Sequence, residues 1–191
     1  MVEGPAARSP LMHIPAPAFG DGLTLREIPF LGLIDLRIDP RDKGAWGAAE
    51  SALVATLPEA NRSADCSAGT VLWLGPDEFL VVTEPGREAA LAAALSAALR
   101  GRRGAVVDIT DSRTTIALSG SHARDLLAKG SGLDLHVRAF APGHCAQSFL
   151  AKVKIALRQL DDAPSYHIIV ERSVAEYLWR WLADAAGEYR R

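Results

Sequence analysis

The central stretch AVVDITDSRTTIAL, residues 105–118, separates two similar halves of the chain. Its apolar runs at 105–109 and 114–118 predict two strands, the first of them short and buried. Asp108, Asp111 and Arg113 lie where one strand leaves the first half and the next strand enters the second. We therefore place the border between two lobes in this stretch.

A strand, a helix, a hairpin and a second helix are predicted upstream of this border. Alternation at 30–38 predicts the strand, and Asp39-Pro40 or Asp42 then offers a cap for a helix. The small, polar segment 61–69 is a predicted loop. Residues 70–83 form the hairpin around a proline-containing turn, and 86–100 the second helix. The apolar face of the first helix consists of Trp46, Ala49, Leu53, Val54 and Leu57.

The same order is predicted downstream of the border. A helix follows the strand 114–118 and ends at Gly130, which we expect to form a left-handed cap. Strands at 153–159 and 166–171 form a second hairpin. In the last helix, Ser173 and Glu176 have the spacing of a capping box. Its apolar stripe consists of Val174, Tyr177, Leu178, Trp181, Leu182 and Ala185.

The repeated order predicts an α+β fold with two pseudo-symmetric lobes. Corresponding positions are Leu31 and Thr114, Val71 and Val153, and Gly86 and Ser173. We expect a single domain at 23–191, with lobes at approximately 23–104 and 105–191. Each lobe is expected to be an antiparallel sheet backed by helices.

Residues 1–22 are expected to form an extended, proline-rich arm outside this domain. Four prolines between residues 5 and 17 prevent a regular hydrogen-bond ladder. Ile14 and Phe19 are apolar and would be unfavourable in water. We therefore expect a partner protein to order the arm, with Ile14 and Phe19 in the interface.

The composition excludes several classes of function. The chain has 21 Lys and Arg against 23 Asp and Glu, so it has no excess positive charge for nucleic acid or an anionic membrane. Two cysteines, Cys66 and Cys145, form neither a disulfide framework nor a CxxC zinc or redox site. The arm lacks the apolar core of a signal peptide. These features predict a cytoplasmic protein that does not bind a membrane.

No self-sufficient catalytic site is apparent in the sequence. The five histidines have no metal-ligand spacing, and no serine lies in a Gly-x-Ser-x-Gly elbow. A Cys145 nucleophile would need a base that the sequence does not locate. Asp108 and Asp111 could be a functional carboxylate pair, but an Asp-stabilised turn with an Arg113–carboxylate contact is favoured. We therefore predict no catalytic, cofactor-binding or metal-binding residues in this chain.

The second half contains a dense series of short motifs: VVDITDSR at 106–113, LSG at 118–120, ARDLLAKG at 123–130, LDL at 133–135, RAF at 138–140, PG at 142–143, CAQ at 145–147, ERS at 171–173, YLW at 177–179 and WL at 181–182. Upstream, LR at 36–37 and LWLGPDE at 72–78 continue the series in the same order. In these motifs the chain resembles the gamma subunit of heterotetrameric sarcosine oxidase.

This resemblance implies a fold like the folate-binding domain of aminomethyltransferases, and a non-catalytic accessory subunit. Larger alpha, beta and delta subunits would hold FAD, FMN, NAD, zinc and tetrahydrofolate. The complex would convert sarcosine, O2 and tetrahydrofolate into glycine, H2O2 and methylene-tetrahydrofolate. The alternative is a stand-alone folate-binding protein of the aminomethyltransferase type.

Trp179 is the predicted interface residue of the last helix. At 100° per residue it lies about 120° from the centre of the apolar stripe. It is therefore either covered by loops of the chain itself or buried by a partner, and tryptophan is enriched at interface hot spots.

Overall fold

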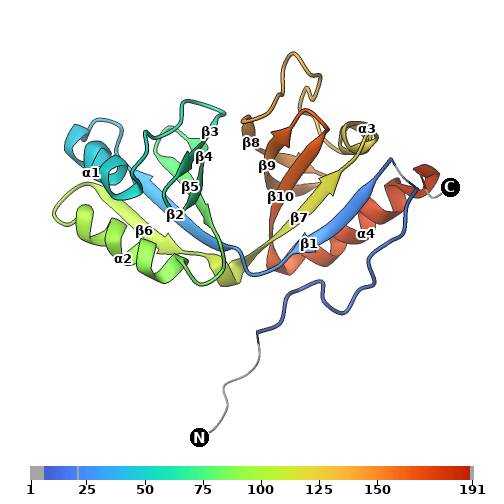
Figure 1. Ribbon diagram of the computed structural model, residues 1–191, viewed down its shortest axis with the longest axis horizontal. Helices are drawn as coiled ribbons and strands as arrows, with labels where there is room; N and C mark the ends of the chain where they lie inside the picture. The colour runs from blue at the N-terminus through green and yellow to red at the C-terminus, as the bar shows by residue number, and fades with distance from the viewer. Residues whose placement is uncertain (1–6, 21, 190–191) are drawn as a thin grey trace, which may run out of the picture.

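Two five-stranded antiparallel sheets, each covered on its outer face by helices, form the two lobes of the protein (Figure 1). The structure is a computed structural model, and it describes residues 7–20 and 22–189. The first sheet has the order β3-β4-β5-β2-β6, and the second has the order β1-β7-β10-β9-β8. The predicted α+β architecture of two antiparallel sheets with helices is confirmed.

The first lobe is continuous in sequence. It consists of β2 (Gly32–Ile38), α1 (Lys43–Leu53), β3 (Ser63–Cys66), β4 (Gly69–Gly75), β5 (Glu78–Thr83), α2 (Glu88–Ala98) and β6 (Gly104–Asp108). Helix α1 begins where the Asp42 side chain accepts a hydrogen bond of 2.9 Å from the backbone N–H of Ala45, as its predicted capping role requires. The predicted hairpin is the β4–β5 pair.

The second lobe combines a strand from the start of the chain with the whole second half. It consists of β1 (Thr24–Ile28), β7 (Arg113–Ser119), α3 (Ala123–Ala128), β8 (Cys145–Leu150), β9 (Val153–Asp161), β10 (Ser165–Glu171) and α4 (Ala175–Ala185). Three short 3-10 turns also occur, η1 (Thr110–Ser112), η2 (Arg172–Val174) and η3 (Gly187–Tyr189).

The lobe limits differ from the expected 23–104 and 105–191 because of β1 and β6. Strand β1 pairs with β7 in the second sheet, whereas β6 pairs with β2 in the first. The main chain therefore crosses between the lobes twice, at 29–31 and at η1. The two sheets correspond strand for strand, with β6 at one edge matched by β1 at the other.

Three strands were not predicted, and one was placed wrongly. Strands β1, β3 and β8 are short and lack clear apolar alternation, and β3 lies inside the predicted loop 61–69. Strand β6 is predicted to be buried but forms a sheet edge, and Val107 is half-exposed. A short apolar run does not distinguish an edge strand from a central one, because that difference depends on the neighbouring strands.

Three assignments at helix ends also differ from the prediction. Gly130 lacks the left-handed conformation expected of it. A Cβ there would lie 2.5 Å from the Trp181 ring, so glycine allows α4 to approach α3 closely. Val54, predicted on the apolar face of α1, is instead the exposed left-handed cap of that helix. Ser173 makes no capping bond, because α4 begins after η2.

Helix α4 buries a face that is rotated from the predicted stripe. Its buried residues are Ala175, Leu178, Trp179 and Leu182, whereas Tyr177 is 49% exposed. Trp179 is 3% exposed and belongs to the core of the second lobe, so its assignment to a partner interface is wrong. The predicted stripe follows from the sequence of α4 alone, whereas the surface that α4 must fit includes the arm as well as the sheet.

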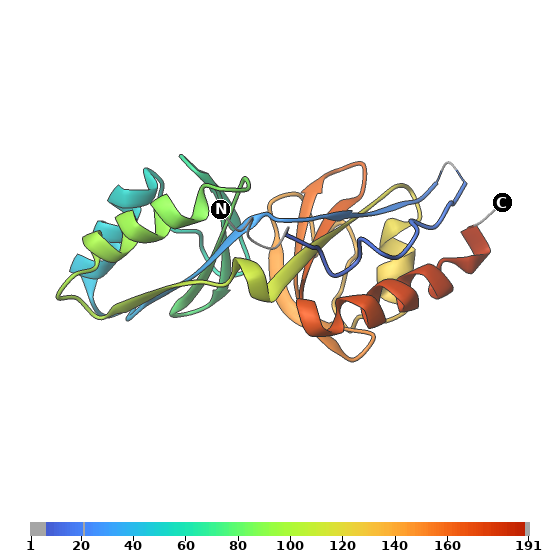
Figure 2. The same cartoon turned by 90° about the horizontal axis from the view of Figure 1, so that it is seen from below.

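The arm explains this rotation. Residues 7–20 run along α4 in an extended path with one turn (Figure 2). The Arg172 guanidinium donates a hydrogen bond of 2.7 Å to the Arg8 carbonyl, and the Gly20 N–H donates one of 3.0 Å to the Tyr189 carbonyl. Leu11 is buried, and Ile14 and Phe19 pack against the same core. The extended arm therefore packs on its own lobe, where Ile14 and Phe19 are partly buried against the core, and their contact with a partner stays a prediction.

Replacing Trp179 with alanine should destabilise the isolated chain. The large cavity left in the core predicts a loss of about 3–5 kcal/mol in the free energy of unfolding, measured by urea denaturation. Tyr177→Ala is the matched control on the same helix, with an expected loss of at most about 1.5 kcal/mol. Equal losses for the two variants would contradict the observed orientation of α4.

Candidate functional site

The two lobes meet through the sheet faces that carry no helices. Six side chains fill this junction, and none is more than 3% exposed. This interlobe cluster consists of Leu33, Leu72, Leu80, Cys145, Ala156 and Ile169. Its close packing makes the junction a structural core rather than a ligand pocket.

Cys145 is part of this core and is not activated as a nucleophile. Its thiol contacts the carbonyl oxygens of Arg62 at 3.0 Å and Trp73 at 3.3 Å, both in the other lobe. Burial raises the pKa of the Cys145 thiol to about 11, so the thiol stays protonated at neutral pH. Burial also lowers the pKa of the adjacent His144. The buried thiol therefore serves the contact between the lobes.

A polar group borders the interlobe cluster on the β9–β10 side. The Arg158 guanidinium donates a hydrogen bond of 3.0 Å to the Thr70 hydroxyl across the junction, and it lies 3.6 Å from the Asp65 carboxylate. His167 lies opposite Arg158 on the neighbouring strand. Burial, helped by the positive charges of Arg158 and Arg26, lowers the pKa of His167 to about 4. His167 is therefore neutral at pH 7.

The predicted Asp108–Arg113 segment forms the second crossing between the lobes. The Asp108 carboxylate accepts a hydrogen bond of 3.0 Å from the Thr110 N–H. The Thr110 hydroxyl accepts one of 3.0 Å from the Leu33 N–H. The Asp-stabilised turn is thus confirmed. The expected Arg113–carboxylate contact is not formed within the part of the chain that the structure describes.

A crevice of about 120 Å³ opens beside this turn. We call it the crossover crevice. The arm, η1, β7 and η2 form its walls, and its charged residues are Arg8, Asp111, Arg113 and Arg172. Phe30 and Thr114 also line it. It is continuous with a shallower groove of about 620 Å³, because both share Pro10, Asp111, Arg113 and Arg172.

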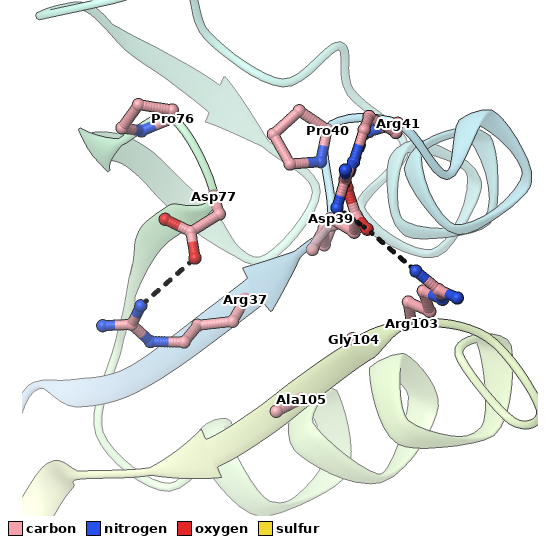
Figure 3. A pocket seen from close by; sticks show the side chains of 10 residues that line it. Arg37, Asp39, Pro40, Arg41, Pro76, Asp77, Arg103, Gly104 and Ala105 are labelled. Carbon is pink, nitrogen blue, oxygen red and sulfur yellow. Dashed lines mark hydrogen bonds and ion pairs between the residues drawn. The ribbon is translucent and has the colours of Figure 1, made fainter.

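A larger groove of about 700 Å³ lies at the far end of the first sheet (Figure 3). Its charged groups are already paired with one another. Arg37 contacts Asp77 at 3.4 Å, and Asp39 contacts Arg41 at 3.1 Å and Arg103 at 3.6 Å. The hydrogen bond from Arg41 lowers the pKa of Asp39 to about 2. This groove therefore presents satisfied ion pairs to solvent.

The five histidines and two cysteines do not gather into a site. Among residues 7–20 and 22–189, no three His, Cys, Asp or Glu side chains are placed to hold a metal ion. Both cysteines are free thiols. None of the described helices is long and apolar enough to cross a membrane.

Sequence reasoning found some of these functional candidates and missed others. Arg113 and Asp111 were singled out, and the structure brings them to the crossover crevice. Arg8 and Arg172 were missed, because they lie far from Arg113 in sequence and meet it only through the arm and the β7–β10 pairing. Arg158 was also missed, because it lies inside the predicted strand 153–159 and meets Thr70 and Asp65 only across the junction.

The family model of the sarcosine oxidase gamma subunit matches residues 37–188. The chain belongs to this gamma subunit family. It is 36% identical over 188 residues to the sarcosine oxidase subunit gamma of Corynebacterium sp. (strain P-1), a match that covers 95% of this chain and 91% of that protein. The predicted family is confirmed.

Two solved structures have folds similar to that of this gamma-family chain. A chain of the heterotetrameric sarcosine oxidase from Corynebacterium sp. U-96, in complex with pyrrole 2-carboxylate, superposes with a TM-score of 0.88 at 32% identity and covers 97% of both chains. Aminomethyltransferase T of the glycine cleavage system from Bartonella henselae superposes with a TM-score of 0.68 at 18% identity. That match covers 88% of this chain and 46% of the transferase, and it shows a shared fold.

The Cys145 thiol of this gamma-family chain should resist modification. At pH 8 a thiol with a pKa of about 11 is only about one part in a thousand thiolate, the reactive form. We expect Ellman's reagent to modify the partly exposed Cys66 at least about a hundredfold faster than Cys145 in the native chain, and both in denaturant. Cys66→Ser should remove the fast phase. A fast phase that survives this substitution would contradict the buried position of Cys145.

His167 should make stability depend on pH. Its pKa is about 4 in the folded chain but near 6.5 when unfolded, so the unfolded chain binds more protons between these values. The free energy of unfolding should therefore fall by up to about 3 kcal/mol as pH drops from about 6.5 to 4. His167→Gln should remove this part of the decrease in urea denaturation, whereas the exposed His136→Gln should not. Identical pH profiles for the His167 variant and the native chain would refute the assignment.

Proposed function

We propose that this chain is the gamma subunit of a heterotetrameric sarcosine oxidase and serves there as an accessory subunit without an active site. The observation that carries the proposal is the superposition on one chain of such a heterotetramer, which covers 97% of both chains. Agreement over the whole length leaves no large insertion or deletion that would indicate a different use of the fold.

The chemistry of the described residues supports an accessory role. The buried Cys145 is protonated, and the charged groups of the groove of about 700 Å³ are paired with one another. A nucleophile needs an adjacent base or a lowered pKa, and Cys145 has a raised one. The interlobe cluster instead fixes the two lobes against each other, which suits a rigid subunit that is held by its surface.

The described residues also do not form an enclosed pocket for tetrahydrofolate, because the grooves of about 700 and 620 Å³ are open to solvent. A ligand of that size needs a pocket of about 300–1,000 Å³ that covers most of its surface. Here the interlobe junction is filled by six buried side chains. The crossover crevice, at about 120 Å³, is too small. We therefore derive no folate step for this chain.

In this proposal the larger alpha, beta and delta subunits carry FAD, FMN, NAD, zinc and tetrahydrofolate. Together they convert sarcosine, O2 and tetrahydrofolate into glycine, H2O2 and methylene-tetrahydrofolate in the cytoplasm. The two free thiols of this chain suit such a reducing compartment. The gamma subunit would support the assembly rather than bind the amine.

Co-purification tests the proposal. The tagged chain, expressed in its native source, should bring down larger flavin-containing subunits under gentle conditions, and the eluate should form H2O2 when sarcosine is added. Recovery of the chain alone, with no flavoprotein and no sarcosine-dependent peroxide, would contradict it.

A tetrahydrofolate titration of the isolated chain tests the alternative of a stand-alone folate-binding protein. We expect calorimetry to detect no saturable binding, because the junction between the lobes is filled. Saturable binding in the micromolar range would favour the alternative and contradict the accessory role.

A further inference from the structure

Three arginines from distant parts of the sequence converge on the crossover crevice. Arg8 comes from the arm, Arg113 begins β7 and Arg172 begins η2. Among the described residues, Asp111 is the only acidic residue that lines the crevice, and it is exposed, while Glu171 lines the adjoining groove. The crevice therefore carries an excess of positive charge within a chain whose formal net charge is −2.

Of these three arginines, Arg113 is partly buried, whereas Arg8 and Arg172 are exposed. Arg37 and Arg158 contact carboxylates. Within the described residues, Arg8, Arg113 and Arg172 form no ion pair, and the buried Nε of Arg113 has no hydrogen-bond partner. A buried guanidinium N–H without a partner is costly, so the Nε of Arg113 favours an anion in the crevice, and the exposed Arg8 and Arg172 add positive charge beside it.

The nearby acidic side chain of Glu27 does not fill this role. Its two oxygens accept hydrogen bonds of 2.6 Å from the Ser9 hydroxyl and 2.7 Å from the Thr114 hydroxyl. Ser9 and Thr114 both line the crevice, so these bonds tie the arm to β1 and β7 at its wall. The arginines remain available to a group from outside.

The volume of the crevice limits the class of that group. A space of about 120 Å³ holds a carboxylate on a short stem but not a nucleotide, flavin or folate. Guanidinium groups bind a carboxylate through paired N–H donors in one plane. The adjoining groove of about 620 Å³ is lined by Pro10, Ser112 and Ser173 among others and leaves room for the main chain that carries the carboxylate.

We propose that the crossover crevice binds an aspartate or glutamate side chain from an extended segment of another subunit of the complex, an inference that rests on the proposed function. An apolar residue beside the arginines favours a protein segment over a free anion. Phe30 lines the crevice, is 45% exposed and is held with φ of 62° in the first crossing. Exposed aromatic rings next to arginines are typical of interface hot spots.

The affinity of the complex tests this site. The double variant Arg113→Gln, Arg172→Gln should weaken association with the larger subunits about tenfold or more, because the partner carboxylate would lose its buried counter-charges. Arg100→Gln is the matched control, since it removes an exposed arginine from the end of α2, in the other lobe. Circular dichroism and thermal melting of each isolated chain must show an intact fold, and Arg113→Lys with Arg172→Lys should retain more affinity than the glutamine pair.

A zero-length cross-link tests the identity of the occupant. In the assembled complex of the Arg172→Lys variant, a carbodiimide should join the new amine to a carboxylate by an amide bond, and the reagent takes up the released water as a urea. Mass spectrometry should find residue 172 joined to an Asp or Glu of another subunit. The Arg100→Lys control should give no such product. A cross-link only to Asp111 or Glu171 of the same chain would overturn the proposal.

The remaining outcomes separate this inference from the proposed function. If the native chain recovers no larger subunit, the proposed function fails first. If the native chain and the glutamine double variant associate equally well, the function stands and the crevice proposal is overturned. If acetate or inorganic phosphate binds the isolated chain saturably through Arg113 while association is unchanged in the double variant, the site takes a free anion, and the partner assignment is wrong.

Discussion

The pairing of β1 with β7 is the constraint on which the rest of the structure depends. It joins the first strand of the chain to the second lobe through five residue pairs and leaves the first lobe as an insertion between them. The chain must then cross the junction twice, and the two crossings lie together. The same pairing directs the preceding arm onto α4, so the position of Trp179, the walls of the crossover crevice and the order of the arm have one origin.

The polar groups at the junction between the lobes contact each other across the two lobes, whereas the crossover crevice carries excess positive charge. In the junction, the Cys145 thiol contacts two carbonyl oxygens and Arg158 has Thr70 and Asp65 as partners. Groups satisfied in this way hold two surfaces together but have little left for a ligand. The buried Nε of Arg113 and that of Arg158 both lack a partner, so the crevice differs in its charge: among the described residues, three arginines line it with one exposed carboxylate. In the proposed accessory role, the packed junction keeps the subunit rigid, and the crevice supplies positive charges that pair with another chain.

The arm shows how a sequence feature can be correctly identified and wrongly interpreted. Residues 7–20 contain no helix or strand, as the prolines predict, and Ile14 and Phe19 are partly buried. The partner that covers them is α4 and the second lobe of the same chain. The apolar side chains of the arm and Trp179, which lies outside the predicted apolar stripe of α4, were each predicted to contact a second protein. In the structure they pack in the same core of this chain.

Local patterns in the sequence determined the elements whose signals are contained within a few residues. The Asp42 cap, the β4–β5 hairpin, the helices and the Asp108 turn follow from side chains and backbone groups close together in the chain. The repeated order of these elements gave the two-lobed α+β fold, and local motifs gave the family. The tertiary structure alone decided which sheet β1 and β6 join, which face α4 buries and which arginines meet at the crevice. Those outcomes depend on contacts between residues such as Arg8 and Arg172, which are distant in sequence, and chain geometry imposes no local pattern on such pairs.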